Sequence, residues 1–331
     1  MQIKKFIGID VSKDTLDFSV VVDGKLLDYK RIENTTKAIN KCISQLTDKH
    51  KAITDSVFCM EYTGVYSLPL MEYLSSIHAL IWMESGVRIR KSMGLVRGKN
   101  DKIDSQRIAM YAYDNKHKMK LWEKPRKEIQ QLANLLALRS RLVKAHKQLL
   151  TPLKELATYI SKQEDKILRA SSNASIKGIE KDIGKTETAI KKIIMDDESL
   201  QIKFKQITSV DGVGMMTAAY LLVTTNEFKN ISDAKKYACY AGVAPFEHSS
   251  GTAIRGKTRV SNMANKKVKT ILHMAAIAAV RMKGELQDYY HRKIAEGKHV
   301  MAVLNAVRNK IILRIFACVN NNKLYQKNYT I

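Results

Sequence analysis

The chain has 331 residues, of which 45% are hydrophobic, enough to build two or three folded domains. Lysine and arginine number 57 against 32 aspartate and glutamate, so the formal net charge is +25, and residues 251–331 alone carry 16 basic and 3 acidic side chains. Because this surplus extends along the whole chain, it favours a nucleic-acid partner over an acidic membrane surface or a merely solvated basic face.

The cysteines and the apolar segments exclude several other classes of protein. Cys42, Cys59, Cys239 and Cys318 form no Cys-x-x-Cys pair, and no histidine cluster has zinc-ligand spacing. The N-terminus lacks a cleavable signal pattern, and the longest apolar run, 271–280, is too short to span a bilayer. We therefore expect a protein of the reduced cytoplasm with no membrane partner.

The first 83 residues show the pattern of an α/β domain. Three short β-branched strands are expected at 3–11, 15–22 and 25–33. Asp23-Gly24 supplies a hairpin turn between the last two. Helices at 36–46 and 66–76 then alternate with strands at 52–60 and 79–83. A meander followed by alternation predicts an RNase H-like (RuvC-like) fold and not a Rossmann sheet, and we assign this domain to residues 1–125.

From residue 126 the pattern becomes helical, with two heptad seams. The first contains Leu135, Leu138, Leu142, Ala145 and Leu149 and stops near Pro152. The second contains Ile176, Ile179, Ile183, Thr186, Ile190 and Ile193. These seams predict an antiparallel coiled-coil or dimerisation arm at 126–200, linked or capped at Ser171-Ser172-Asn173. Helix packing inside a single core is the alternative.

Residues 201–331 form the predicted C-terminal domain, which is mostly α-helical. Within residues 207–222, two helices flank the turn Gly212-Val213-Gly214, as in a helix-hairpin-helix element. The turn amides and the following helix N-terminus can hold a phosphate, so Gly212 and Gly214 are candidate nucleic-acid contacts. A simple turn that ends one packed helix and begins the next explains the same glycines.

Four carboxylates stand at the ends of predicted elements: Asp10, Glu61, Asp101 and Asp104. The last two share one face of a probable helix, where like charges repel unless a cation lies between them. Mg²⁺ prefers oxygen ligands, and four carboxylates can hold two ions roughly 4 Å apart to clamp a phosphoryl transfer. Singly, Asp10 is also explained as a turn cap and Asp101 as a helix N-cap.

A second candidate site lies in the loop expected from Pro245 to Gly256. It contains the adjacent hydroxyls of Ser249 and Ser250, which are followed by the cations Arg255, Lys257 and Arg259. A serine can attack phosphorus when charged partners and a metal stabilise the product. An ordinary serine-rich loop that contacts phosphates fits these residues equally well.

The chain resembles the IS110 family of transposases, also called DEDD transposases, over nearly its whole length. In the N-terminal half the resemblance rests on Gly8-Ile9-Asp10-Val11-Ser12, Glu61-Tyr62-Thr63-Gly64 and the Lys-x-Asp-x-x-Asp segment that ends at Asp104. In the C-terminal half it rests on Tyr240-Ala241-Gly242-Val243-Ala244-Pro245 through Ser250-Gly251, and the Val210–Gly214 turn stands where the family has one.

This resemblance implies that Asp10, Glu61, Asp101 and Asp104 bind metal. It implies that a serine before a glycine, by position Ser250 with Ser249 as its neighbour, becomes linked to a DNA 5′ phosphate. It also implies guidance by a structured RNA encoded beside the gene, which pairs with target and donor DNA.

The expected function is therefore site-specific DNA recombination. The acids hold Mg²⁺ at the scissile phosphate, Ser250 attacks, and the released 3′-OH later attacks a phosphoserine linkage to rejoin strands. Because the serine lies far along the chain from the acids, we expect a site shared between protomers of a dimer or tetramer. Arg255, Lys257 and Arg259 are expected to contact backbone phosphates.

Other classes fit parts of the pattern. A RuvC-like structure-specific nuclease would use metal-activated water and no serine. A non-catalytic RNA-binding scaffold would keep the fold without needing the acids, and all four are present. A sugar-kinase-like ATPase has a related core, but the sequence shows no second glycine-rich phosphate loop.

Overall fold

The computed structural model describes residues 3–50, 55–92, 100–250, 254–260 and 264–326. The side chains of residues 47–50 and 247–259 fall outside this description. The chain divides into two compact units, Met1–Lys124 and Pro125–Ile331, and the predicted arm at 126–200 belongs to the second. None of the described helices combines the length and the apolar character needed to cross a bilayer.

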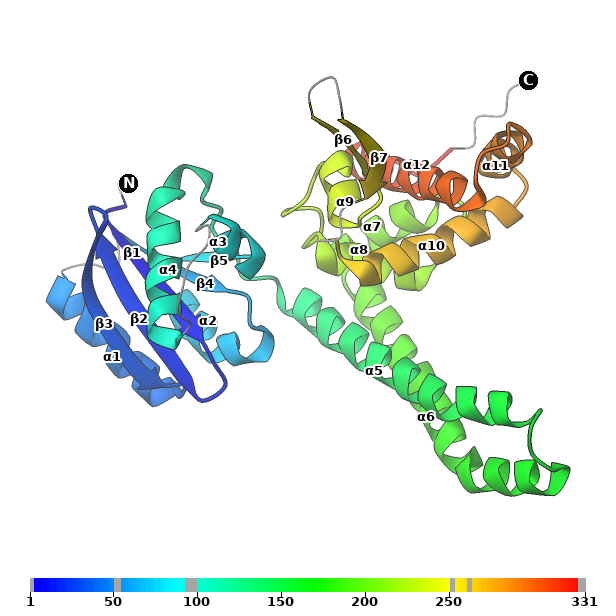
Figure 1. Ribbon diagram of the computed structural model, residues 1–331, viewed down its shortest axis with the longest axis horizontal. Helices are drawn as coiled ribbons and strands as arrows, with labels where there is room; N and C mark the ends of the chain where they lie inside the picture. The colour runs from blue at the N-terminus through cyan, green and yellow to red at the C-terminus, as the bar shows by residue number, and fades with distance from the viewer. Residues whose placement is uncertain (1–2, 51–54, 93–99, 251–253, 261–263, 327–331) are drawn as a thin grey trace. The chain divides into compact units, whose positions relative to one another are not determined.

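The first unit contains a five-stranded mixed sheet in the order β3-β2-β1-β4-β5 (Figure 1). Its strands are β1 (Lys5–Val11), β2 (Thr15–Val22), β3 (Lys25–Glu33), β4 (Ser56–Glu61) and β5 (Leu80–Glu84). The first three form the predicted antiparallel meander, while β4 pairs in parallel with both β1 and β5. Asp23 and Gly24 adopt left-handed conformations at the predicted turn. The sheet thus has the RNase H-like element order that the sequence predicts.

Helices cover both faces of this sheet, because successive strand residues point to opposite sides. They are α1 (Thr36–His50), α2 (Leu68–Ser76), α3 (Gly86–Ser92) and α4 (Asp101–Asp114), with short 3-10 helices η1 (Gly64–Ser67) and η2 (Lys116–Lys118). Ile7 and Ile9 pack with α1 and α2, whereas Phe6 packs with α3 and α4. The same alternation places Asp10 on the α4 side of the sheet.

Helix α4 crosses β1 at Gly8 with no space for a side chain. A Cβ on Gly8 would lie 2.1 Å from the backbone nitrogen of Ala109 and 2.3 Å from the carbonyl oxygen of Ser105. Beside this crossing, the buried hydroxyls of Ser19 and Ser105 are hydrogen-bonded at 2.7 Å. The glycine therefore lets α4 approach closely enough to bring its first turn toward the end of β1.

The second unit is mostly helical, as predicted, and its helices share one hydrophobic core. They are α5 (Lys127–Leu156), α6 (Lys162–Asp196), α7 (Glu198–Thr208), α8 (Met215–Thr224), α9 (Ala234–Tyr240), α10 (Lys266–Arg281), α11 (Glu285–Ala295) and α12 (Val300–Asn320). Strands β6 (Pro245–Ser250) and β7 (Ile254–Val260) form an antiparallel hairpin. This hairpin corrects the loop expected from Pro245 to Gly256, because a polar, glycine-containing segment can still satisfy its backbone groups by pairing with itself.

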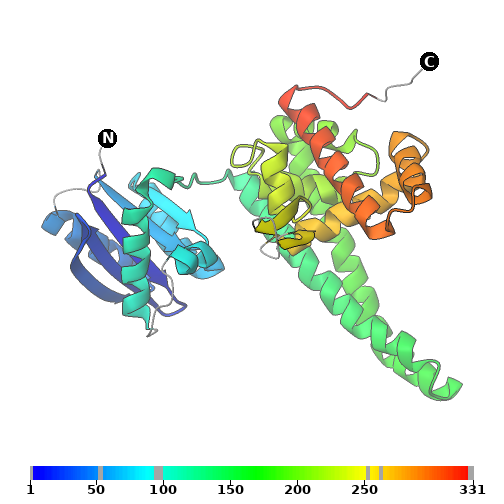
Figure 2. The same cartoon turned by 45° about the horizontal axis from the view of Figure 1, so that its top comes forward.

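Helices α5 and α6 lie side by side as an antiparallel helical hairpin (Figures 1 and 2). On α6 the predicted seam faces inward, with Thr186 and Ile190 buried. On α5 the predicted seam is buried only in part, because Leu135 packs against the core while Leu138 and Leu149 are each 38% exposed. The buried side chains of α5 are instead Ile129, Leu132 and Leu136.

Ion pairs occupy part of the contact between these two helices. Arg139 of α5 contacts Glu187 of α6 at 2.6 Å, and His146 contacts Glu180 at 3.0 Å. Both α5 residues continue the stripe that begins with its buried apolar side chains. Since polar side chains stand at these inward positions, the predicted coiled coil is not confirmed.

The ends of the hairpin also differ from the prediction. Pro152 lies inside α5, and Ser171-Ser172-Asn173 lies inside α6. The two helices are connected by residues 157–161 instead. Ser161 and Glu164 form a capping box there, in which each side chain accepts a backbone N–H of the other residue.

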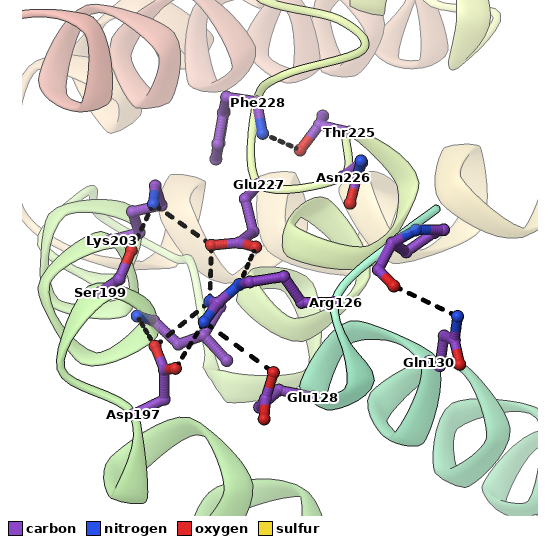
Figure 3. A network of polar contacts seen from close by, with 12 residues as sticks. Arg126, Glu128, Gln130, Asp197, Ser199, Lys203, Thr225, Asn226, Glu227 and Phe228 are labelled. Atoms are coloured by element: carbon purple, nitrogen blue, oxygen red, sulfur yellow. Dashed lines mark hydrogen bonds and ion pairs between the residues drawn. The ribbon is translucent and has the colours of Figure 1, made fainter. Parts of the chain in front are cut away.

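Arg126 ties the start of α5 to the rest of the second unit (Figure 3). It donates to Asp197, between α6 and α7, at 2.7 Å and to Glu227, between α8 and α9, at 2.8 Å. Lys203 contacts the same Glu227 carboxylate at 3.4 Å. Burial opposes the charge on Glu227, but the hydrogen bonds and charges of Arg126 and Lys203 outweigh it and lower the pKa of Glu227.

Candidate functional site

The acids predicted to bind metal come from adjoining parts of the first unit. Strands β1 and β4 are parallel neighbours, and Ile9 pairs with Met60. Asp10 and Glu61 are therefore the next residues on adjacent strands, at the same edge of the sheet. Asp101 and Asp104 occupy the first turn of α4, which crosses β1 at Gly8. We call Asp10, Glu61, Asp101 and Asp104 the acid cluster.

The pKa of Asp10 shows how closely this group is coupled. Burial raises that pKa first, and the charges of Asp104, Asp101, Asp17 and Glu61 raise it further, to about 6. All three other members of the acid cluster are thus within electrostatic reach of Asp10. The structure brings the four predicted acids together, while their role as metal ligands stays a prediction.

The structure does not use Asp10 as a turn cap or Asp101 as a helix N-cap. The N-cap of α4 is Asn100, whose side chain accepts the amide of Ile103 at 2.8 Å. The turn after β1 is held by Ser12, whose hydroxyl accepts the amide of Thr15 at 3.0 Å. Neither acid is therefore needed as a cap, which leaves the clustering of carboxylates to be explained.

Two members of the acid cluster are paired with arginine. Asp101 contacts Arg31 at 3.2 Å, and Asp104 contacts Arg107 at 3.0 Å. Among the described residues, no three histidine, cysteine, aspartate or glutamate side chains converge tightly enough to enclose an ion. The arginines supply part of the positive charge that a group of neighbouring carboxylates requires.

The sequence analysis missed a polar group beneath the cluster. Asp17 stands directly opposite Asp10 in the β1–β2 register and is 1% exposed. It accepts a hydrogen bond from the Tyr29 hydroxyl at 2.5 Å and lies 3.8 Å from Arg31. A signal was present, because Asp17 and Ser19 interrupt an otherwise apolar strand at alternate positions.

Glu61 is held in a narrow space. A Cβ on Gly86, the first residue of α3, would lie 1.8 Å from the Oε1 atom of Glu61. Any side chain at position 86 would therefore displace the carboxylate. The packing role of this second glycine, like that of Gly8, was not identified from the sequence, because it comes from a contact between two elements, here β4 and α3.

The predicted serine site lies on the β6–β7 hairpin. Ser249 pairs with Arg255 and Ser250 pairs with Ile254 along its backbone. Lys257 and Arg259 follow on β7. The hairpin thus places the predicted cations on the strand next to the serines, while the directions of these side chains lie outside the described part of the chain.

The two glycines of the predicted phosphate turn have different surroundings. The turn joins α7 to α8, as the helix-hairpin-helix pattern predicts. Gly212 has a φ of +79°, and a Cβ there would lie 2.4 Å from the carbonyl oxygen of Ala275 on α10. Gly214 is the N-cap of α8 and makes no side-chain cap. Packing accounts for Gly212, and a phosphate contact at Gly214 stays a prediction.

Two family models match the chain. Residues 7–160 match the model of the DEDD transposases of IS110 type, and residues 205–291 match the model described as the transposase IS116/IS110/IS902 family. The two matches cover the acid cluster and the β6–β7 hairpin respectively.

Curated relatives align along the full chain or along part of it. The pilin gene-inverting proteins of Moraxella lacunata and Moraxella bovis are 25% and 24% identical, with 98% of each chain covered. The IS110 uncharacterized 43.6 kDa protein of Streptomyces coelicolor is 36% identical over 121 residues, covering 36% of this chain and 29% of that protein. The RuvC chain of T. thermophilus, solved with a Holliday junction substrate, is 10% identical with a TM-score of 0.28, covering 36% of this chain and 99% of its own.

Proposed function

Because the chain belongs to the IS110 family of transposases, we propose that it cuts and rejoins DNA at specific sites through a carboxylate–metal centre and a serine nucleophile. The observation that carries this proposal is the acid cluster, whose members come from two strand ends and one helix start. Burial first, and then the charges of its other three members, raise the pKa of Asp10. The full-length similarity to proteins named for inverting a pilin gene supports a rearrangement of DNA over simple degradation.

The donor set of the acid cluster suits Mg²⁺. All of its groups are carboxylates, and hard divalent cations prefer oxygen ligands. Asp10, Glu61, Asp101 and Asp104 would hold two ions, which when bound supply positive charge to the attacking and leaving oxygens of a phosphoryl transfer. The neighbouring acids that raise the pKa of Asp10 are a reason for this cluster to take up cations.

The nucleophile in this proposal is the hydroxyl of Ser250, at the end of β6. Its oxygen forms a bond to the phosphorus and the bond to the 3′ oxygen breaks, while the serine proton is transferred and the 3′ oxygen gains a proton. One phosphodiester becomes one phosphoserine ester plus a free 3′-OH. Because the number of phosphate esters is unchanged, the reverse attack can rejoin strands without an external energy source.

The partners proposed are duplex DNA at the element ends and at the target, a structured guide RNA, and further copies of this chain. The net charge of +25 supports the polyanionic partners. A half-exposed leucine stripe on α5, which includes Leu138 and Leu149, supports contact between protomers in a dimer or tetramer. Arg255, Lys257 and Arg259 would contact backbone phosphates near the serine.

A covalent adduct separates this mechanism from a nuclease that activates water. Protein, Mg²⁺, labelled DNA and the RNA transcribed beside the gene are incubated, and label that stays with the denatured protein is counted. Ser250→Ala is expected to abolish both adduct and cleavage, and Ser249→Ala is the matched control expected to retain them. An adduct lost only in Ser249→Ala would move the nucleophile by one residue. Cleavage unaffected by either change would establish the water-activating alternative.

A further inference from the structure

A buried arginine in the second unit has no described acid beside it. Arg308 of α12 is 4% exposed. It donates to Asn305 at 3.2 Å and to the Nδ1 atom of His273 on α10 at 2.8 Å, while its Nε has no hydrogen-bond partner. No carboxylate pairs with it in the part of the chain that the structure describes. A buried charge without a counter-ion is costly, and such charges are normally paired.

Two further basic groups lie close to this arginine. Lys269 and His273 are one helical turn apart on α10, which packs against α12. Burial lowers the pKa of both, and the positive charge of Arg308 lowers each further. We call Lys269, His273 and Arg308 the basic cluster. The hydrogen bond to a neutral His273 holds Arg308 in place, but the positive charges of Lys269 and Arg308 repel one another.

The acids of the C-terminal region are placed elsewhere. Residues 251–331 contain only three, namely Glu285, Asp288 and Glu296. Glu285 contacts Arg314 at 2.5 Å, and Glu296 contacts Lys293 at 2.6 Å. Asp288 is exposed on α11. Among the described residues, Arg314, six positions along α12 from Arg308, is balanced by a carboxylate, whereas Arg308 is not.

The basic cluster lies near the base of the hairpin that bears Ser250. Asn305, one turn before Arg308, donates to the carbonyl oxygen of Val243 at 2.7 Å. Asn265, one turn before Lys269, donates to the Tyr240 hydroxyl at 2.8 Å. The segment from Tyr240 to Val243 is thus fixed to the starts of α10 and α12, and it leads directly into β6.

We propose that Lys269, His273 and Arg308 form an anion site that binds a phosphodiester group of the nucleic-acid substrate. The identification of the anion as nucleic acid rests on the proposed function, whereas the need for an anion rests on the uncompensated charge. A phosphate supplies the negative charge that the described acids do not, and charge-assisted hydrogen bonds to it are the strong kind.

Each member offers a donor suited to phosphate. A guanidinium can only donate, so the Nδ1 atom of His273 accepts from Arg308 and the remaining proton of a neutral His273 is on Nε2. Lys269 and His273 are partly exposed and form the accessible rim, and Arg308 lies beneath them. Arg308 thereby positions His273 as well as adding charge.

The test compares two arginines on the same helix. Thermal unfolding of the full chain is followed by circular dichroism at 222 nm, first without phosphate and then with inorganic phosphate, with chloride at matched ionic strength as reference. Arg308→Met is expected to raise the midpoint without phosphate, because it removes an unpaired buried charge. Arg314→Met is expected to lower it, because Glu285 loses its partner. Phosphate should raise the midpoint of the wild type and of Arg314→Met but not of Arg308→Met.

Binding experiments with different nucleic acids identify the source of the phosphate. Single-stranded DNA, duplex DNA and RNA of one sequence are titrated against wild type, Arg308→Met and Lys269→Met. The preferred nucleic acid should bind each cluster variant about tenfold more weakly or worse, as expected for lost hydrogen bonds to a charged group. Lys269 is on the rim, so Lys269→Met tests the site without a change in the buried core.

Several results would overturn the anion site. They are a destabilised or unfolded Arg308→Met protein, a phosphate response equal to that of chloride, or unchanged nucleic-acid affinity in Lys269→Met. The proposed function fails separately, through the absence of a covalent adduct. A phosphate response without an adduct would keep the anion site and reject the serine mechanism, and an adduct without a phosphate response would do the reverse.

Discussion

The two units each gather side chains of like charge, but they treat that charge differently. In the first unit, Asp101 and Asp104 of the acid cluster are paired with arginines. In the second unit, no carboxylate of the described residues lies beside Arg308 of the basic cluster. An acid cluster with internal cations can persist before its metal binds, whereas a basic cluster without internal anions depends more on its ligand. A cluster of like charges that the fold does not require therefore indicates a ligand of opposite charge. The indication is strongest where the fewest counter-ions lie beside the cluster.

The largest expected effect comes from removing an acid. Asp10→Ala, Glu61→Ala, Asp101→Ala or Asp104→Ala should each slow DNA cleavage by about a thousandfold, because metal-borne charge contributes several kcal/mol to a phosphoryl-transfer transition state. The measurement is the cleavage rate of labelled DNA in Mg²⁺, with folding checked by thermal unfolding. Asp14→Ala, an exposed acid in the turn after β1, is the control expected to cleave normally. A wild-type rate in Asp10→Ala would remove the metal assignment.

The next effect tests whether the position of α4 assembles the acid cluster. Gly8→Ala should lower the free energy of unfolding by about 3 kcal/mol and slow cleavage, because the new Cβ meets the backbone of α4. Both tryptophans, Trp82 and Trp122, belong to the first unit, so their fluorescence reports its unfolding. Gly178→Ala on α6, where nothing lies within 4 Å, should instead stabilise the second unit slightly. A stable, active Gly8→Ala protein would contradict this account.

Local patterns predicted the sheet and the four acids. Strand alternation and the Asp23-Gly24 turn are encoded within a few residues, and Asp10 and Glu61 were recognisable because they end apolar strands. The polar group of Asp17 was not recognisable, because its position opposite Asp10 depends on the cross-strand register. A single sequence gives strand positions more readily than it gives pairings.

Helix packing was harder to predict for a related reason. The α5 seam was assigned by counting leucines, whereas the inward stripe includes Arg139, whose charge is paired across the interface. His273 and Arg308 come from helices whose contact no periodicity predicts, so the basic cluster was invisible in the sequence. The net charge indicated a basic protein, but only the packing of α10 on α12 shows which charges lack a counter-ion.

The two clusters should respond to pH in opposite directions. The pKa of Asp10 is raised from 3.8 to about 6, so its stabilising contribution is complete below pH 3.8 and is lost as the pH rises through 6. The pKa of His273 is lowered from 6.5 by burial and by Arg308, so its contribution is present above pH 6.5 and is lost as the pH falls through its lowered value.

Variants separate these contributions. Without divalent cations, Asp10→Asn should be more stable than wild type above pH 6 by about 1 kcal/mol. This value is reduced for solvent screening, because Asp10 is partly exposed. Below pH 3.8 the two proteins should be equally stable. Tryptophan fluorescence follows this change in the first unit, and His273→Gln should flatten the pH response seen at 222 nm. An Asp10→Asn protein that gains stability equally at every pH would show that burial of a polar group, and not its charge, sets the cost.

The smallest expected effect comes from removing Arg31, a counter-ion of the acid cluster, which leaves that cluster less compensated, like the basic one. Arg31 contacts Asp101 and lies near the buried Asp17, but its side chain is 52% exposed, so solvent screens most of its charge. Arg31→Met should lower the stability of the first unit without divalent cations by about 0.5 kcal/mol. Because carboxylate repulsion is then less compensated, added Mg²⁺ should raise the tryptophan-detected unfolding midpoint more in Arg31→Met than in wild type. Arg88→Met, which removes a surface partner of Glu84, is the control expected to leave the Mg²⁺ response unchanged. Equal Mg²⁺ responses in all three proteins would mean that Arg31 is an ordinary surface charge and that the two clusters differ in burial alone.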